Sequence, residues 1–385
     1  MAAAHNRRIL APALRRGRSP RTGGTVLRRL AILLLFACMG EGLAQSPGAP
    51  APDPATQVDA AMALPEELRL ALDARKPDRG LPVEERVQRL VDFMIGDDGL
   101  ALRYQEQPTH GIAESYAQRK VNCLSFTLMF IALARASGIR AYAQASDDAL
   151  AMRVLGDTVY RATHVNAGVE IGGGRYTVDV GWRSLLAVRK PRTITDAQAI
   201  ALLHNNNAVE RLLSGDRQGA AAHAEVALAL DPGSATAWSN AGVVYLRSGS
   251  RDAAERAYLQ ALKLQRDHLG ALSNLVGFYR EAGATHLAEG YAKRLRRAQS
   301  VDPFSQFLIA QALAESGAYD DAVAHYRRAI RLMPDEPQFH RSLADAYLRQ
   351  GNATAAEHAR NRAGRLEAQR ESQRGIRDAA SPGSG

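Results

Sequence analysis

Residues 238–262 read WSNAGVVYLRSGSRDAAERAYLQAL, and this stretch shows the pattern that decides the fold of the C-terminal half. Apolar residues at helical spacing lie on both sides of Gly249. That glycine belongs to a series with a constant step of 34 residues: Gly215, Gly249, Gly283, Gly317 and Gly351. Alanines keep the same step: Ala220, Ala254, Ala288, Ala322 and Ala356. Because both series persist over five periods, we predict five repeats of one helix pair over residues 201–367.

The two series have a physical explanation. Each glycine is expected in the turn between two helices, and each alanine where those helices cross closely. One helix pair cannot bury its apolar face alone, so neighbouring pairs must stack. The second repeat also shows the tetratricopeptide (TPR) spacing at Trp238, Gly242, Tyr245, Ala254, Tyr258 and Ala261. The region therefore resembles a TPR array, and that resemblance implies an all-α solenoid with a concave groove for a protein or peptide partner.

Asparagines recur at one slot of the first three repeats. Asn206, Asn240 and Asn274 are again 34 residues apart. A row of amides along a groove can hydrogen-bond an extended backbone without reading its sequence. The alternative is that asparagine at this slot reflects repeat composition alone. Leu308 and Ser342 occupy the slot in the last two repeats, so any such row would be short.

Upstream of the repeats, helical patterns give way to strands. Helices are expected over 65–76, over 83–97 and from Cys123 to Gly138, and alternating apolar residues then predict strands over 164–171 and 175–182. The glycines at 172–174 predict a hairpin turn between the two strands. Residues 65–198 are therefore expected to form an α+β domain.

Cys123 is one of only two cysteines in the 385-residue chain. Asn122 is a good N-cap, which would place the thiol in the first turn of a helix. The positive end of a helix stabilises a thiolate, and its N–H groups can stabilise an oxyanion. The position therefore suits a nucleophile. The alternative is that Cys123, like many single cysteines at a helix start, only packs against its neighbours and has no chemical role.

The order of cysteine on a helix, histidine on a strand and aspartate on the next strand resembles the transglutaminase-like branch of the papain-type fold. The matching segments are NCLSFTLMFIALARASGIRAY, THVNAGV and YTVDVGW. The resemblance implies that Cys123 is the nucleophile, His164 the general base and acid, and Asp179 the group that orients His164. The family's usual aromatic residue two positions after the histidine is Asn166 here.

The hairpin offers a geometric condition for this triad. If Gly172 and Gly173 form the turn, Ile171 pairs with Gly174 and Asn166 with Asp179. His164 and Asp179 then become diagonal neighbours on one face, while a slip of one residue would separate them.

The N-terminus predicts export. Residues 1–44 contain eight arginines and one acid, and an apolar core, LAILLLFAC, precedes small residues at 42–44. We expect a signal peptide over 1–44, a Pro/Ala-rich linker over 45–64 and a periplasmic destination. Lipidation at Cys38, with membrane anchoring, is the alternative. The rest of the chain has 41 basic against 39 acidic side chains, which does not support a nucleic-acid partner.

These features favour one function and leave a second open. The first is an exported cysteine acyl-transfer enzyme that hydrolyses a peptide or amide bond rather than crosslinking, with the repeats recruiting its protein or peptide partner. The second is a TPR adaptor whose transglutaminase-like domain is structural. No cofactor is expected, and no metal site either, because His110, His164 and Cys123 lack ligand spacing. The polar tail over 368–385 is expected to be disordered.

Overall fold

The computed structural model describes residues 53–75, 80–155, 158–172, 174–178 and 192–379. For 146–155, 158–164 and 370–379 it describes the backbone only. The predicted signal peptide lies outside these residues. The helices of the mixed region and the strands are α1 (Pro54–Met62), α2 (Glu66–Ala74), α3 (Val83–Ile95), α4 (Ile112–Gln118), α5 (Cys123–Ala136), β1 (Arg103–Tyr104), β2 (Lys120–Val121), β3 (Ala141–Leu155), β4 (Thr158–Ile171), β5 (Gly174–Val178) and β6 (Arg192–Ile194).

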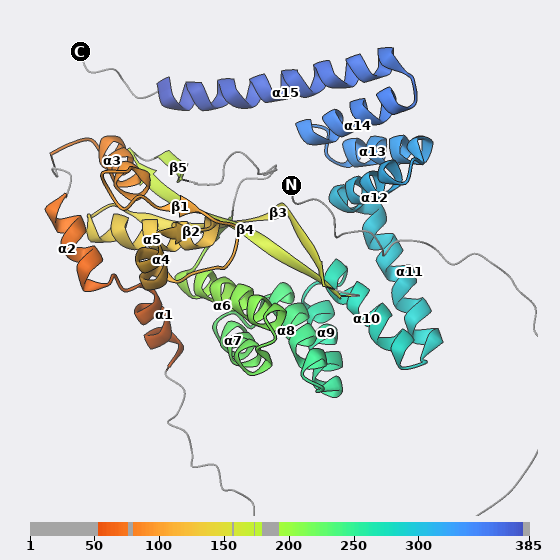
Figure 1. Cartoon of the computed structure of the whole chain (residues 1–385), viewed down its shortest axis with the longest axis horizontal. Helices are drawn as coiled ribbons and strands as arrows, with labels where there is room; N and C mark the ends of the chain where they lie inside the picture. Colours follow the sequence, from red (N-terminus) through yellow and green to blue (C-terminus); the bar gives the residue numbers. More distant parts are fainter. Residues whose placement is uncertain (1–52, 76–79, 156–157, 173, 179–191, 380–385) are drawn as a thin grey trace, which may run out of the picture. The chain divides into compact units, whose positions relative to one another are not determined.

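The repeat region follows as an unbroken series of helices (Figure 1). They are α6 (Asp196–Leu213), α7 (Arg217–Leu230), α8 (Ala235–Arg247), α9 (Arg251–Leu264), α10 (Leu269–Glu281), α11 (Thr285–Val301), α12 (Pro303–Glu315), α13 (Tyr319–Leu332), α14 (Pro337–Arg349) and α15 (Ala353–Ala379). No helix among the described residues combines the length and the apolar character needed to cross a membrane.

The four-stranded sheet is antiparallel, with the strand order β5-β4-β3-β6. Ile171 pairs with Gly174, as the predicted hairpin requires, and the register continues to the pair Ala167–Val178. Gly172 has a φ of +55°, the left-handed conformation that this turn needs from a glycine. The predicted register is therefore confirmed as far as Val178. A second, two-stranded sheet pairs β1 with β2 in parallel.

Helix α5 is the buried centre of the mixed region. All its residues from Leu124 to Ala134 are buried, and they share a core with Val165, Ala167 and Val169 of β4. The helix ends at Ala136 with Ser137 as its C-cap, after which Gly138 turns the chain with a φ of +73°. The predicted helix from Cys123 to Gly138 is therefore present. Its apolar faces fix where its first turn, and thus Cys123, lies against the sheet.

Helix α6 belongs to two cores. Its first half buries Ile200 and Leu203 in the core that surrounds α5. Its second half buries Ala208 and Leu212 in the core of the first repeats. The domain boundary expected near residues 198–201 therefore lies within the continuous helix α6, which both regions share.

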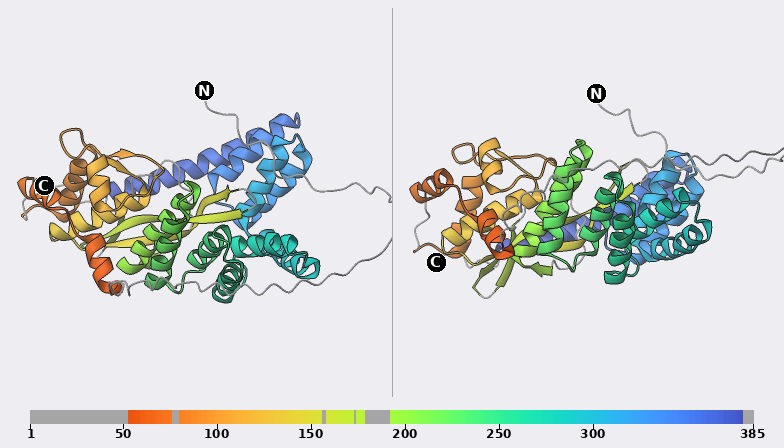
Figure 2. Two further views of the ribbon diagram at one scale, coloured as in Figure 1. Left: turned by 60° about the horizontal axis from the view of Figure 1, so that its bottom comes forward. Right: turned by 90° about the horizontal axis from the view of Figure 1, so that it is seen from below.

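The predicted repeat turns are confirmed by backbone geometry. The five periodic glycines, which stand between the two helices of each pair, have φ values of +89°, +85°, +68°, +83° and +80°: Gly215, Gly249, Gly283, Gly317 and Gly351. The five periodic alanines are at most 2% exposed: Ala220, Ala254, Ala288, Ala322 and Ala356. Successive pairs contact one another, α7 with α8, α9 with α10, α11 with α12 and α13 with α14 (Figures 1 and 2), as stacking requires.

Two glycines allow a matched test of this geometry. A Cβ at Gly249 or at Gly277 would meet no atom within 4 Å, but only Gly249 has a positive φ, of +85°. We expect Gly249→Ala to lower the free energy of unfolding by about 1–2 kcal/mol, because of backbone strain alone. Gly277→Ala, inside α10, should raise it by up to about 1 kcal/mol. Urea denaturation of both variants measures the difference, and equal effects would contradict the turn assignment.

Two expected unstructured segments are helical instead. Residues 54–62, assigned from sequence to the linker, form α1, and its Val58, Ala61 and Met62 pack against the main core. The C-terminal tail continues α15 as far as Ala379. Residues 54–62 contain several alanines, and the tail contains arginines and glutamines, and these residues favour a helix even where Pro/Ala or polar composition suggests a disordered chain.

Candidate functional site

The start of α5 is built as a capped helix N-terminus. The side-chain oxygen of Asn122 accepts a hydrogen bond of 2.9 Å from the backbone N–H of Ser125, so the predicted N-cap is confirmed. Cys123 is the first residue of the helix and a free thiol, and it is partly exposed. A thiol in the first turn of a capped helix experiences the positive end of the helix dipole.

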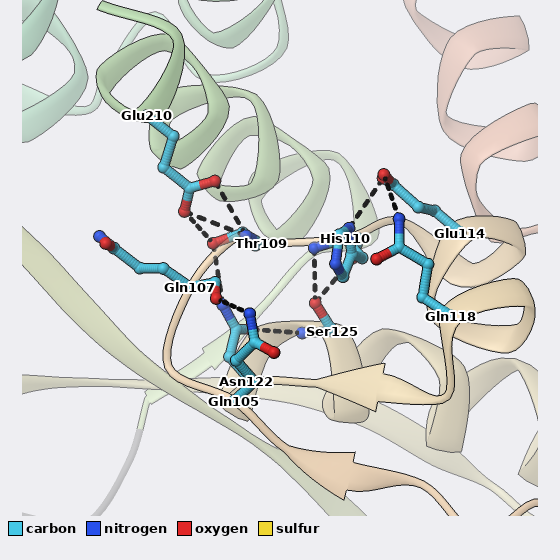
Figure 3. Close-up of polar contacts among 9 residues, drawn as sticks. All are labelled: Gln105, Gln107, Thr109, His110, Glu114, Gln118, Asn122, Ser125 and Glu210. Atoms are coloured by element: carbon cyan, nitrogen blue, oxygen red, sulfur yellow. Dashed lines mark hydrogen bonds and ion pairs between the residues drawn. The ribbon is translucent and has the colours of Figure 1, made fainter. Parts of the chain in front are cut away.

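A chain of hydrogen bonds connects this cap to the repeats (Figure 3). The Asn122 side-chain amide donates to the Thr109 hydroxyl at 2.8 Å and, more weakly, to the Glu106 carbonyl at 3.5 Å. The Thr109 hydroxyl donates to a carboxylate oxygen of Glu210 on α6 at 2.8 Å. The Thr109 backbone N–H donates to both oxygens of the same carboxylate, at 2.9 and 3.0 Å. The loop before α4 is thus held between the start of α5 and the first repeat.

His110 lies beside the same turn, although no sequence motif pairs it with α5. Its backbone N–H donates to the Ser125 hydroxyl at 3.0 Å, and that hydroxyl donates to the His110 carbonyl at 2.7 Å. Its ring is buried, with Nδ1 3.0 Å from a carboxylate oxygen of Glu114, and Nε2 has no hydrogen-bond partner among the described residues. Gln118, at the end of α4, donates to Glu114 at 3.1 Å.

The three residues of the predicted triad are described to different extents. Cys123 is at the start of α5. His164 is on β4, opposite Ser146 of β3, in a segment whose side chains lie outside the description. Asp179 follows directly after β5 and lies outside the described residues. The hydroxyl of Thr127, one turn after Cys123, donates to the carbonyl of Val165 at 3.3 Å, so α5 and β4 meet one residue from His164.

The three predicted groove amides do not share one environment. Asn206 donates to the Thr109 hydroxyl at 3.5 Å, toward the mixed region. Asn240 and Asn274 are buried on α8 and α10. The partner of Asn240 is Asn205, whose side-chain oxygen accepts from the Asn240 amide at 2.9 Å. The run of three asparagines at 205–207 was the sequence signal for this contact, but the 34-residue step alone selects Asn206.

A histidine pair joins the two helices of the first repeat. The Nδ1 atoms of His204 on α6 and His223 on α7 are 2.8 Å apart, so one ring donates to the other. Burial, and to a lesser extent His223, lower the pKa of His204 from 6.5 to about 4. Burial followed by the charge of Arg211 lowers the pKa of His223, although Asp216 opposes this. Both rings are therefore neutral at pH 7.

This pair predicts a pH dependence of stability. The unfolded chain binds a proton at His204 below pH 6.5, whereas the folded chain resists it until about pH 4. The stabilisation is complete above pH 6.5 and is lost as the pH falls toward 4. We expect a loss on the order of 1–2 kcal/mol, after allowing for water around the partly exposed rings. Urea denaturation at pH 6.5 and near pH 4 should show a smaller loss of unfolding free energy in His204→Gln than in the wild type. An equal loss in both proteins would contradict the assignment of this pH dependence to His204.

The described residues hold no group of three or more His, Cys, Asp or Glu side chains that could bind a metal ion.

Two family models match the repeats. One, described as a tetratricopeptide repeat, covers residues 211–277, and another, described as a TPR repeat, covers residues 310–351. The C-terminal half of the chain therefore carries TPR repeats, preceded by a mixed α/β region with a small antiparallel sheet.

Several solved structures are similar over part of the chain. "MamA 41-end from Desulfovibrio magneticus RS-1" is 18% identical, covers 44% of this chain and 96% of its own, and has a TM-score of 0.26. "MamA MSR-1 C2" is 19% identical over 44% of this chain and 98% of its own, with a TM-score of 0.25. "Crystal structure of YrrB: a TPR protein with an unusual peptide-binding site" is 22% identical over 43% and 86%, with a TM-score of 0.24. No curated protein matches the chain.

Proposed function

We propose that the repeats bind an extended segment of a protein partner along the face formed by the first helix of each pair. The observation that carries this proposal is the unbroken series of five helix pairs. Consecutive first helices contact one another within the first three repeats, α6 with α8 and α8 with α10, and within the last two, α12 with α14, while the third and fourth pairs meet through α11 and α12. Stacked repeats create such continuous surfaces for extended ligands. Asn240 and Asn274 lie on α8 and α10, but both side chains are buried, so the bound segment would contact the exposed residues around them and not these amides.

Strand β4 of the mixed region also contacts α6, α8 and α10. The mixed region therefore borders the first three repeats, and a segment bound to them would lie close to it. This arrangement suits a protein whose repeats present a partner to the site at the start of α5.

Peptides selected from a random displayed library test the binding proposal. Ser342 is partly exposed on α14, at the slot that asparagine occupies in the first repeats, and Glu289 is exposed on α11, a second helix. We expect selected peptides to lose affinity about tenfold in Ser342→Arg and to bind Glu289→Arg as they bind the wild type. Failure to select any peptide, or the reverse order of effects, would count against the proposal.

We propose as a second function that Cys123 is the nucleophile of an acyl transfer to water, acting on a peptide or amide bond of the bound partner. The favouring observation is the partly exposed thiol on the first turn of a capped helix whose residues from Leu124 to Ala134 are buried. The thiolate attacks the carbonyl carbon to form a thioester while the amine leaves, and water then releases the acid and the thiol. His164 would move the protons and Asp179 would orient it.

If the thiol site does not catalyse a reaction, the chain is an adaptor that only binds its partner. The variant Cys123→Ser distinguishes the enzyme from the adaptor. The enzyme requires the sulfur, so cleavage of a peptide selected on the repeats should stop while its binding persists. Wild-type protein that binds such peptides without cleaving them would favour the adaptor.

We also propose that the chain is exported, with residues 1–44 removed. Mass spectrometry of the mature N-terminus tests this proposal. A mature chain that starts after residue 44 is expected, whereas a lipid on Cys38 would show membrane anchoring.

A further inference from the structure

Three side chains form a one-directional hydrogen-bond chain between the first repeat and the start of α5 (Figure 3). Glu210 accepts from the Thr109 hydroxyl at 2.8 Å, Thr109 accepts from the Asn122 amide at 2.8 Å, and Asn122 accepts from the Ser125 N–H at 2.9 Å. Thr109 is 3% and Asn122 5% exposed, so water cannot readily replace these bonds.

We propose that Glu210 is a positioning residue for Cys123. The carboxylate fixes both donors of Thr109, Thr109 holds Asn122 in the rotamer that caps α5, and the cap aligns the helix start that carries the thiol. The thiol site thus includes the first TPR helix, and the repeats do more than recruit a partner. The hydrogen-bond geometry stands on its own, whereas its effect on the reactivity of Cys123 rests on the proposed thiol chemistry.

The direction in which Glu210→Ala changes the reaction rate of Cys123 distinguishes a positioning role of Glu210 from a purely electrostatic one. A carboxylate near a thiol disfavours the thiolate, so if Glu210 acted only through its charge, Glu210→Ala would speed the reaction of Cys123 with iodoacetamide. Loss of positioning weakens the cap and slows that reaction. We expect Glu210→Ala and Thr109→Val each to slow it about threefold or more near neutral pH, on the scale of a lost N-cap. The difference should vanish at high pH, where the thiol is ionised regardless of the cap.

Two controls make the test specific. Thr109→Ser keeps the hydroxyl and should restore the wild-type rate. Glu225→Ala removes a carboxylate that is exposed on α7 and should leave the rate unchanged. A slowing that is constant over the whole pH range would indicate changed access to the thiol and would overturn the positioning role.

Hydrogen–deuterium exchange of residues 119–130 gives a readout independent of thiol reactivity. Faster amide exchange at the start of α5 is expected in Glu210→Ala and Thr109→Val, but not in Thr109→Ser or Glu225→Ala. Unchanged exchange in the first two variants would overturn the inference. If wild-type Cys123 fails to react while the exchange changes as expected, the thiol function fails and the coupling stands.

Discussion

Replacement of Tyr258 by alanine is expected to lower the free energy of unfolding by about 3–5 kcal/mol, the largest effect that we anticipate for a single side chain. Tyr258 is fully buried on α9, in the core shared by the first three repeats. A Cβ built at Gly242 on α8 would lie 2.5 Å from its ring, so the ring packs directly over the α8 backbone. Its removal would leave a cavity between helices that the tight pairing cannot close.

The neighbouring Leu259 provides the matched control, because its side chain is 39% exposed. Leu259→Ala should cost well under about 1 kcal/mol in the same urea titration. A similar loss in both variants would mean that the α8–α9 contact does not depend on the ring.

The Tyr258 hydroxyl allows a refinement. Its oxygen is buried without a hydrogen-bond partner among the described residues, and burial raises the pKa of the phenol. Tyr258→Phe keeps the ring and removes the unsatisfied oxygen. We therefore expect a protein at least as stable as the wild type, with a gain of up to about 1 kcal/mol. A clear loss of stability would reveal a polar contact of the hydroxyl that matters to folding.

His164→Ala is expected to slow the alkylation of Cys123 about tenfold or more below neutral pH, the largest effect that we anticipate on reactivity. In the proposed mechanism the imidazole takes the thiol proton, and its loss leaves only the helix start to stabilise the thiolate. The contact between Thr127 and Val165, at 3.3 Å, brings β4 and α5 together one residue from His164.

His110→Ala is the comparison that makes this result informative. His110 is buried beside the same helix turn and contacts Glu114, so it is the rival imidazole at this end of α5. If His110→Ala slows the alkylation and His164→Ala does not, the base has been assigned to the wrong histidine. If neither variant slows it, with both proteins folded, the thiol has no imidazole partner.

The sequence predicts the repeats well, because their physical requirements recur every 34 residues. A positive φ between two helices demands glycine, and a close helix crossing demands alanine, so Gly249 and Ala254 reveal a turn and a crossing without any structure. The N-cap at Asn122 and the hairpin pairing of Ile171 with Gly174 are equally local, and both were predictable.

Contacts between distant segments were not predictable. Glu210 and Thr109 are 101 residues apart and follow no motif, so only the packing of α6 against the mixed region reveals their contact. The step of 34 selects Asn206, whereas the helix geometry pairs Asn205 with Asn240. Helix α1 was missed because its Pro/Ala-rich surroundings conceal three apolar side chains that reach the core.

The proposed acyl-transfer function requires that the fold make Cys123 a nucleophile at the start of α5. The most direct test compares iodoacetamide labelling of Cys123, at about pH 6, in the folded protein and in the same protein unfolded in urea. We predict faster labelling of the folded protein, although its thiol is partly buried, because the helix start stabilises the thiolate. Slower labelling of the folded protein, or none, would contradict the claim and leave a repeat protein that binds its partner without acting on it.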